Sequence, residues 1–452
     1  MESLKLKGIP QIEKLLQDKK IAHWFPLISR ALTTNIVRET IETIRKECLS
    51  GTVVPSYSSI TERIDKECRK KWRRRIMRVV NATGIILHTN MGRSPIAEET
   101  WRSAEAVNCG YSNLEFDLET GKRGGRSGLL PDLFSALVGA ESALIVNNNA
   151  AAVFLILSVF ATGREVIVSR GEQIQIGGGF RIPDILRLSG ARLVEVGTTN
   201  ITTVEDYLGA ITENTAMVLK VHRSNFSVHG FTREPSTAEL AGALPENVLL
   251  AVDQGSGTTG ESLPGETGVA EYIRQGAHLV CFSADKVLGG PQAGCIVGKR
   301  EYIDTLSKHP LMRTFRPGKT IYSLLEDFLI RRLNGEQSKA GESFGRTLWE
   351  MRKIGNRIIR SLGRRFLSIT PSTMMTGGGS SPDTIARSLS IELRLPDKPE
   401  NVSRKLRDLP IPIIGTIDSD CVYLNLATID SKDVRYIISS LVTLIAEYAQ
   451  CT

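Results

Sequence analysis

A repeating alternation of short apolar runs and helical stretches constrains the fold of this 452-residue chain more than any other feature. From Val79 onward, runs such as EVIVS, RLVEV and VLLAVD end in polar or glycine-bearing loops, and a helical pattern follows each. The order strand, loop, helix is typical of βαβ units, which span roughly 30 residues each. It predicts an α/β fold with a mostly parallel sheet and helices on both faces, whose binding site lies at the carboxyl ends of the strands.

Two further regions flank this pattern, and together they predict three domains. Residues 1–78 have helical periodicity, with breaks at Pro26 and at Gly51–Pro55, and form an N-terminal basic helical domain. Residues 79–318 form the large domain. Residues 319–452 comprise a linker helix and a small C-terminal α/β domain, in which TIARSLSIEL and CVYLNLAT are the expected strands.

The positive charge of the chain is concentrated near its N-terminus. Residues 1–80 carry 18 basic and 9 acidic side chains, a net charge of +9, whereas the remaining residues carry 39 basic and 40 acidic ones. Eight of the basic residues lie within KECRKKWRRRIMR, residues 66–78. Charge alone leaves two interpretations open: this domain binds a polyanion, or its helices have a solvated basic face.

Several classes of protein are excluded by simpler observations. The longest apolar run, near Ala150–Ala161, is too short to span a bilayer, and the N-terminus lacks the apolar block of a signal peptide. Seven scattered cysteines with no CxxC spacing argue against a disulfide scaffold or a zinc site, and no HExxH occurs among the six histidines. We therefore expect a cytoplasmic protein with no metal site and no membrane association.

The segment CFSADKVLGGPQAGCIVG, residues 281–298, is the strongest chemical signal in the sequence. An apolar run leads into Ser-Ala-Asp-Lys, and three glycines then keep the space around Lys286 free of side chains. A desolvated lysine amine forms imines with aldehydes, and pyridoxal phosphate is the aldehyde cofactor that uses one. The alternative is an ordinary surface lysine.

The cofactor hypothesis requires further groups, and the other strand ends supply them. Asp253 ends a strand and is placed to keep the pyridine nitrogen protonated. The helix that starts after Asn147-Asn148-Asn149 offers free backbone amides for a phosphate. The remaining predicted neighbours of the cofactor are Asn149, Ala150, Ala151 and Ser283 at the phosphate, and His222, Ser224 and Asn225 near the ring. A Rossmann dinucleotide site is the competing interpretation, but no GxGxxG follows the first strand.

Several of these segments together resemble one known family. They are RVVNATGIILHTNMGRSP (78–95), GYSNLEFDLETGKRGGR (110–126), NNNAAAVFLIL (147–157), GEQIQIGGGFRIPD (171–184), KVHRSNF (220–226) and SADKVLGGPQAG (283–294). The family is the bacterial L-seryl-tRNA(Sec) selenium transferases, or selenocysteine synthases, which are fold-type-I pyridoxal-phosphate enzymes. The resemblance is dense between residues 78 and 326 and thin beyond Gly335.

The resemblance implies roles for individual residues. Lys286 is the Schiff-base lysine and Asp253 the partner of the pyridine nitrogen, while Asn149 to Ala151 and Ser283 hold the cofactor phosphate. Three arginines match positions that the family uses to bind the phosphate group of the selenium donor; they are Arg93, Arg313 and Arg316. Guanidinium groups suit such an anion because they donate in pairs.

The resemblance also implies a reaction and its partners. It is the conversion of L-seryl-tRNA(Sec) to L-selenocysteinyl-tRNA(Sec) with selenophosphate, through an aminoacrylyl (dehydroalanyl) intermediate. The basic N-terminal domain then binds tRNA, and the subunits form a homo-oligomer, a ring of dimers of the decamer type. Two rivals stay open: a pyridoxal-phosphate lyase acting on a small amino acid or amino-sugar phosphate, and an RNA-binding protein with a vestigial cofactor site.

Overall fold

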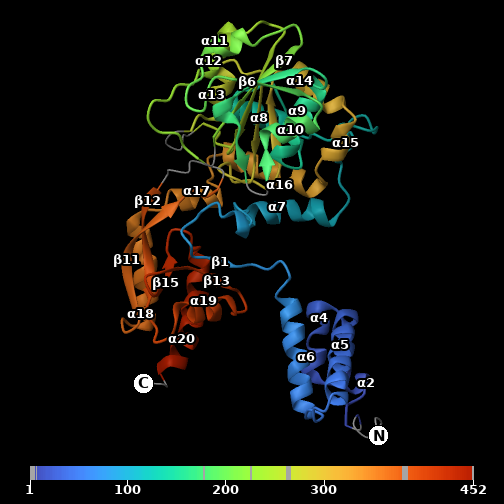
Figure 1. Cartoon of the computed structure of the whole chain (residues 1–452), viewed down its shortest axis with the longest axis vertical. Coiled ribbons are helices and arrows are strands. Elements are labelled where there is room, and N and C mark those ends of the chain that lie inside the picture. Colours follow the sequence, from blue (N-terminus) through green and yellow to red (C-terminus); the bar gives the residue numbers. More distant parts are fainter. Residues whose placement is uncertain are drawn as a thin grey trace. The chain divides into compact units, whose positions relative to one another are not determined.

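The computed structural model describes residues 6, 8–176, 179–223, 226–260, 266–378 and 385–449. The chain forms two compact units, Met1–Arg78 and Val79–Thr452, and each is described by itself (Figure 1). Among the described residues, no helix is long and apolar enough to cross a bilayer.

The N-terminal unit is built around two long helices that pack against each other. Ile36 and Ile44 of one helix and Ile60 and Ile64 of the other are fully or almost fully buried in its core. Its helices are α2 (Ile12–Gln17), α3 (Lys19–Ala22), α4 (Phe25–Ile28), α5 (Arg30–Leu49) and α6 (Tyr57–Trp72). Pro26, which the sequence suggested as a break, lies in the first turn of α4, where a missing N–H costs nothing.

A seven-stranded mixed sheet forms the centre of the second unit (Figure 1). In spatial order its strands are β2 (Ser142–Val146), β10 (Gly294–Gly298), β9 (Leu279–Ser283), β8 (Leu249–Gly255), β7 (Thr215–Val221), β3 (Glu165–Ser169) and β6 (Arg192–Val196). Neighbouring strands from β9 to β6 run parallel, and β10 alone is antiparallel to both of its neighbours. The expected mostly parallel sheet is confirmed.

Helices cover both faces of this sheet because its strands alternate their apolar side chains between the two faces. Leu144 and Val146 of β2 belong to the core beneath α9, whereas Ala143 and Ile145 belong to the opposite core beneath α8. The helices of this part are α7 (Glu98–Cys109), α8 (Leu130–Val138), α9 (Asn149–Phe160), α10 (Ile182–Leu188), α11 (Val204–Gly209), α12 (Thr237–Ala243), α13 (Val269–Arg274), α14 (Arg300–Lys308), α15 (Leu311–Phe315) and α16 (Lys319–Leu333).

The C-terminal part of the unit is a four-stranded antiparallel sheet with helices packed on it (Figure 1). The strands, in spatial order, are β11 (Leu367–Met375), β12 (Ile385–Leu393), β15 (Cys421–Asn425) and β14 (Thr416–Asp418). The helices are α17 (Lys339–Phe344), α18 (Leu348–Leu362), α19 (Pro399–Arg407) and α20 (Val434–Ala449). Where the sequence predicts a linker helix at the start of residues 319–452, the structure has three successive helices, α16, α17 and α18.

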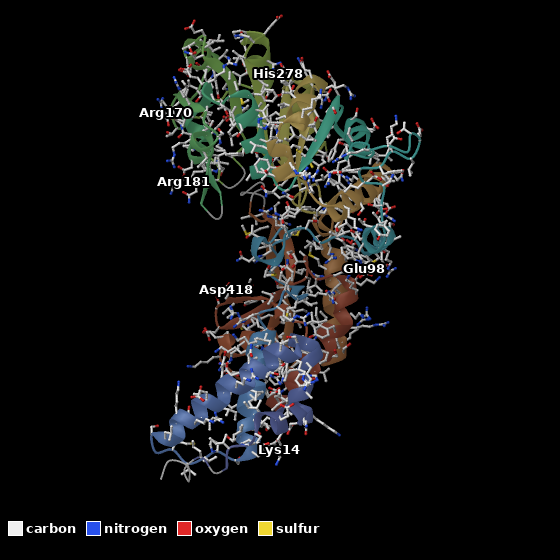
Figure 2. The ribbon with its side chains drawn as sticks, turned by 90° about the vertical axis from the view of Figure 1, so that its right-hand side faces the viewer. Lys14, Glu98, Arg170, Arg181, His278 and Asp418 are labelled. Atoms are coloured by element: carbon white, nitrogen blue, oxygen red, sulfur yellow. The ribbon has the colours of Figure 1, made fainter. Side chains whose placement is uncertain are left out.

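The chain that follows residue 78 ties this part to the large sheet. A two-residue strand, β1 (Val80–Asn81), pairs in parallel with β13 (Ile413–Ile414). Glu98, at the start of α7 (Figure 2), forms an ion pair with Lys432 in the 3-10 helix η3 (Ser431–Asp433). The remaining short elements are the 3-10 helices η1 (Thr89–Met91) and η2 (Arg170–Glu172) and the hairpin strands β4 (Gln175–Ile176) and β5 (Phe180–Arg181).

Candidate active site

The predicted cofactor residues gather at one edge of the large sheet. β2, β8 and β9 run in the same direction, so their carboxyl ends meet there. Asn149 follows β2, Asp253 lies in β8, Ser283 ends β9 and Lys286 lies in the connection from β9 to β10. The antiparallel β10 begins at the same edge, between β2 and β9.

Asp253 is a buried carboxylate with a defined partner. Its side chain is 3% exposed, and its Oδ1 accepts a 2.7 Å hydrogen bond from Nδ2 of Asn149. Burial raises the pKa of Asp253, although the Asn149 hydrogen bond and the positive charge of Lys286 oppose this rise. The sequence placed Asn149 at the cofactor phosphate, and the structure adds a bond from its side chain to the carboxylate.

Lys286 is a buried amine among charged groups. It is 5% exposed, and burial lowers its pKa, helped by the nearby guanidinium of Arg93. The carboxylates of Asp253, Asp285 and Glu266 act in the opposite direction. A lysine in this environment holds a larger fraction of neutral, nucleophilic amine than a surface lysine does.

The N-terminus of α9 supplies the predicted anion site. Asn148 caps the helix, and its Oδ1 accepts from the backbone N–H of Ala151 at 2.9 Å. The amides of Asn149 and Ala150 occupy the first positions of the helix, where no intrahelical acceptor exists. Ser283, 6% exposed, ends a strand two places away across β10. This arrangement presents helix-end amides and a hydroxyl at the same edge.

Gly294 keeps these two elements close together. It is the first residue of β10 and pairs with Val146 on one side and with Ser283 on the other. A Cβ atom at this position would lie 2.2 Å from the carbonyl oxygen of Asn148 and 2.8 Å from the amide of Asn149. A side chain here therefore requires the start of α9 to move.

We predict that Gly294→Ala destabilises the chain and weakens its anion site. Overpacking against backbone costs about 1–3 kcal/mol, so the thermal midpoint of the cofactor-free protein should fall. Its affinity for pyridoxal phosphate, measured by absorbance titration, should fall at least about tenfold. Gly242→Ala in α12 is the matched control, since a Cβ there meets nothing within 4 Å. Equal midpoints and affinities for the two variants would contradict this assignment.

Of the three predicted donor-binding arginines, Arg93 lies closest to the lysine in the described contacts. Its Nη1 donates to both oxygens of Asp285, at 3.1 and 2.8 Å, and Asp285 immediately precedes Lys286. Asp285 is 6% exposed. Asp285 was not among the predicted site residues, although its position beside the lysine was a visible signal.

Arg313 and Arg316 lie elsewhere on the same edge. The carbonyl of Phe315 accepts from the amide of Asn147 at 2.8 Å, which places the end of α15 beside the turn before α9. Arg316 donates to Oε1 of Glu115 at 3.0 Å, whereas Arg313 is exposed and makes no side-chain bond with the described residues. The described contacts therefore join Arg93, but not Arg313 or Arg316, to the lysine.

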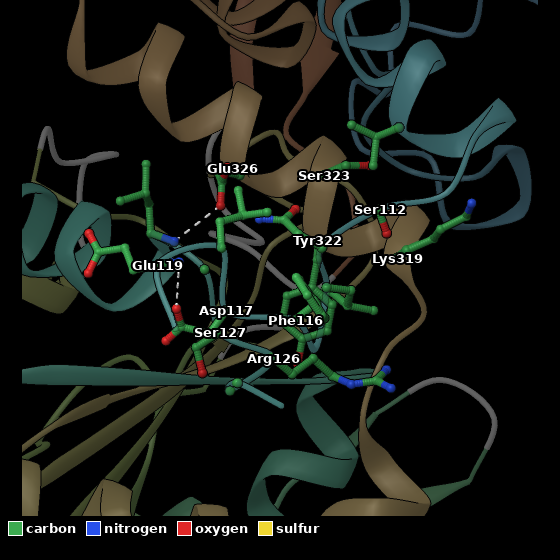
Figure 3. A pocket seen from close by; sticks show the side chains of 18 residues that line it. Ser112, Phe116, Asp117, Glu119, Arg126, Ser127, Lys319, Tyr322, Ser323 and Glu326 are labelled. Atoms are coloured by element: carbon green, nitrogen blue, oxygen red, sulfur yellow. Dashed lines mark hydrogen bonds between the residues drawn. The ribbon is translucent and has the colours of Figure 1, made fainter. Parts of the chain in front are cut away.

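The segment around Glu115, the residue that accepts from Arg316, lines a separate pocket. Glu115 accepts from Arg126 and Arg123 as well, and the Arg126 hydrogen bond lowers the pKa of this carboxyl. The pocket, about 660 Å³, is formed by residues 107–129 and one side of α16, where Glu326 accepts from the amide of Leu129 (Figure 3). It does not include Lys286.

Glu266 is a buried acid of the site that sequence reasoning missed. Its Oε2 accepts hydrogen bonds of 2.6 Å from both Ser256 and Thr258, and its Oε1 lies 3.6 Å from Nε2 of His222. Burial by itself raises the pKa of Glu266, but the hydrogen bonds from His222, Ser256 and Thr258 outweigh it and hold this pKa below its usual value. No motif marked Glu266, because Ser256 and Thr258 precede it at irregular spacing in the same connection and His222 comes from a different segment.

His222, in turn, joins Glu266 to the cofactor edge. Its backbone N–H donates to the carbonyl of Asp253 at 2.9 Å, and its ring is partly buried. The other two predicted neighbours of the ring, Ser224 and Asn225, lie outside the described residues. Glu172 and Gln173, near the end of β3, accept from Lys220 and donate to Glu195, respectively.

We predict that Glu266→Gln lowers the free energy of unfolding by about 2 kcal/mol near neutral pH, because the two hydroxyls then bond to a neutral amide. The folded-state pKa of Glu266 is depressed below the reference value of 4.5, so its ionic stabilisation is complete above that pH. It is lost as the pH falls toward the folded pKa. The difference between wild type and variant, measured by urea denaturation, should therefore shrink below pH 4.5.

The control for this measurement is Glu271→Gln on α13, which removes a carboxylate from an i,i+3 pair with Arg274 at the surface. We expect a change within about 0.5 kcal/mol for the control. A Glu266→Gln difference that stays constant from pH 7 to pH 3 would show that the charge of Glu266 contributes nothing.

These residues fit pyridoxal phosphate. A buried amine, a buried carboxylate and a helix N-terminus lie at one edge, as that cofactor requires. One buried polar atom at the same edge, Oδ1 of Asn149, has no hydrogen-bond partner in the described part of the chain. Buried polar atoms are normally bonded, so this atom indicates a polar ligand. The described residues contain no cluster of three or more metal-ligating side chains.

Comparison with known proteins gives a consistent set of relatives. The family described as SelA, L-seryl-tRNA selenium transferase, matches residues 79–430. The L-seryl-tRNA(Sec) selenium transferase of Geotalea uraniireducens is 40% identical, covering 97% of this chain and 99% of its own length. That of Caldanaerobacter subterraneus subsp. tengcongensis is 39% identical, with 98% of each chain covered. The similarity therefore includes most of the N-terminal unit.

Among solved structures, that of D-glucosaminate-6-phosphate ammonia-lyase has a TM-score of 0.60 at 19% identity. The match covers 83% of this chain and 97% of the lyase chain. At this identity the similarity shows a shared fold and nothing about activity. It confirms the fold class that the sequence predicts.

Proposed function

Because this chain belongs to the family of L-seryl-tRNA selenium transferases, we propose that it converts L-seryl-tRNA(Sec) to L-selenocysteinyl-tRNA(Sec), with pyridoxal phosphate as cofactor and selenophosphate as selenium donor. One structural observation carries the chemical part of the proposal. Lys286 and Asp253 are both buried at the carboxyl edge of the sheet, beside the N-terminus of α9.

Pyridoxal phosphate, when bound, supplies an electron sink for the pair of electrons left at Cα after its proton is removed. Lys286 holds the cofactor and, once its amine is released, takes the Cα proton of the seryl group. Its burial lowers the pKa of the amine and so favours the neutral form that accepts a proton. A positioned base of this kind contributes about 10²–10⁴-fold to the rate.

Asp253 would hold a proton at the ring nitrogen, and Asn149 orients its carboxylate by donating to Oδ1. The amides of Asn149 and Ala150, with the hydroxyl of Ser283, bind the cofactor phosphate. His222 lies beside the ring, and Glu266 orients it from behind. Ser224 and Asn225 complete the ring environment in this proposal.

The donor phosphate binds to arginines. Arg93 lies next to Lys286 through Asp285, so a selenium delivered there is close to the seryl β-carbon. Arg316 binds the donor phosphate once this phosphate replaces Glu115 as its hydrogen-bond acceptor, because both groups are anions that suit a guanidinium. Arg313 has no competing partner among the described residues. Selenium then replaces the β-hydroxyl oxygen of serine, which leaves as water, and hydrolysis of the Se–P bond takes up one water and releases phosphate.

Family membership supports further proposals about the tRNA and the assembly. We propose that residues 1–78 bind tRNA, that residues 79–318 and 319–452 act as the cofactor domain and a smaller C-terminal domain, and that the protein is cytoplasmic. We further propose a ring of dimers, of the decamer type. The net charge of +9 in residues 1–80 supports the RNA-binding role.

Incubation with seryl-tRNA(Sec) and selenophosphate tests the function. After mild hydrolysis of the ester, selenocysteine should replace serine among the released amino acids. The rival is a lyase that acts on a small amino acid or amino-sugar phosphate. Ammonia released from such a substrate, with no selenocysteine formed, would overturn the proposal in favour of the lyase.

A further inference from the structure

The exposed face of α18 is strongly basic, although the unit that contains it is close to neutral overall. Between residues 348 and 365 the chain carries six basic side chains and one acidic side chain, Glu350. All six are exposed; they are Arg352, Lys353, Arg357, Arg360, Arg364 and Arg365. Residues 81–452 carry 39 basic and 40 acidic side chains, so their total charge conceals this local excess.

The cations on α18 form a stripe along one side of the helix. Lys353, Arg357 and Arg360 follow one another at i+4 and i+3 spacing, which places them one above the other. The opposite side of α18 packs on the C-terminal sheet (Figure 1), where a Cβ on Gly355 would lie 2.8 Å from Cδ1 of Ile369. Because the helix lies so close to the sheet there, the cationic stripe faces away from it.

These cations have no acidic partners in the described part of the chain. Lys353, Arg357 and Arg360 make no ion pair there. Glu350 is engaged at the start of the helix, where its Oε2 accepts from the backbone N–H and the hydroxyl of Thr347 at 2.8 Å each. Like charges one turn apart destabilise a helix. The stripe therefore costs stability that an external anion would recover.

An exposed tryptophan lies at the N-terminal end of the stripe. Trp349 is 70% exposed, and Nζ of Lys353 lies 5.3 Å from the centre of its ring. Aromatic rings stack on unpaired bases, and neighbouring Lys and Arg neutralise phosphates. An acidic protein surface would satisfy the cations but gives no reason for the exposed ring. The combination favours RNA.

We propose that the exposed face of α18, defined by Trp349, Lys353, Arg357 and Arg360, is a second RNA-binding surface that contacts the phosphate backbone of the tRNA substrate. It lies in the C-terminal part of the second unit and is separate in sequence from the basic N-terminal unit. The identity of the RNA rests on the proposed function, whereas the surface itself rests on the charges and exposure of α18.

The test uses the full-length protein and a tRNA(Sec) transcript without an amino acid, so that binding is measured without the reaction. The variant is Lys353→Gln, Arg357→Gln and Arg360→Gln together. At about 0.15 M salt its dissociation constant should rise about tenfold or more, and the slope of log K against log salt should fall by about 2–3. The thermal midpoint should not fall, because the substitutions relieve repulsion.

The matched control removes the same charge from the large-sheet part. Arg187→Gln, Arg192→Gln and Lys308→Gln are exposed there, on α10, β6 and α14. Their combined variant should bind the transcript as the wild type does. If the α18 variant and this control have equal affinities and equal salt slopes, the proposal is wrong.

Trp349 gives a second measurement that does not depend on the triple variant. The emission of Trp349, taken as the difference between wild type and Trp349→Phe, should be quenched by the transcript, and Trp349→Ala should weaken binding about fivefold or more. Absence of quenching would overturn the proposal. These binding results stand whether or not the protein forms selenocysteine, so failure of the proposed function and failure of this surface are distinguishable.

Discussion

Lys286→Ala should reduce the formation of selenocysteinyl-tRNA by about 10⁴-fold or more, the largest effect that we expect from a single substitution. The amine is the group that holds the cofactor and accepts the Cα proton, and it is 5% exposed, so bulk water is a poor replacement. Single-turnover rates with saturating seryl-tRNA measure this loss directly.

The covalent role of Lys286 has an independent readout. Wild-type protein reduced with borohydride in the presence of pyridoxal phosphate should retain the cofactor on one peptide that contains Lys286, as mass spectrometry detects. The Lys299→Ala variant, which removes an exposed lysine at the start of α14, should behave as the wild type. Cofactor retained equally by Lys286→Ala protein would show that another lysine does this work.

Removal of residues 1–78 should raise the dissociation constant for tRNA(Sec) about 100-fold while leaving the cofactor site intact. The N-terminal unit carries most of the net positive charge, and phosphate neutralisation dominates RNA affinity. Among the described residues, its apolar core contains only side chains between Leu6 and Trp72, so residues 79–452 lose no core side chain. Filter binding at several salt concentrations measures the first effect, and absorbance of bound pyridoxal phosphate measures the second.

Neutral substitutions provide the control for this deletion. Arg73→Gln, Arg74→Gln and Arg75→Gln, made together in the full chain, should weaken tRNA binding less than the deletion does and reduce its salt dependence. If the shortened chain binds tRNA(Sec) as tightly as the full chain, the N-terminal unit has another role. Loss of the cofactor absorbance would show instead that the two units depend on each other.

The strand ends were predictable because each apolar run stops at a polar or glycine-bearing loop. Asp253, Ser283 and Lys286 could therefore be assigned to one edge from sequence alone, and the structure places them there. The same pattern predicted the mostly parallel sheet. It did not predict the antiparallel direction of β10, because a short apolar run has the same pattern in either direction.

Contacts between distant segments could not be read from local patterns. The bond between Asn149 and Asp253 joins residues 104 positions apart, and the bond between Arg93 and Asp285 joins residues 192 apart. Glu266 is bonded to Ser256 and Thr258 of its own connection and lies beside His222 of a distant segment, and no pattern around Glu266 signals this arrangement. Such groups become visible only when packing brings their partners together.

The direction of β10 has a consequence for the mobility of Lys286. β9 and β10 form a hairpin whose ten-residue connection, residues 284–293, carries the lysine, and five register pairs fix the two strands. Ordering a chain costs roughly 1–2 kcal/mol of conformational entropy per residue. The two ends of the connection are already ordered in the folded protein, because the paired strands β9 and β10 hold them. Substrate binding need not order them again. The lysine side chain can therefore move between its partners during a catalytic cycle while the backbone beneath it keeps its place.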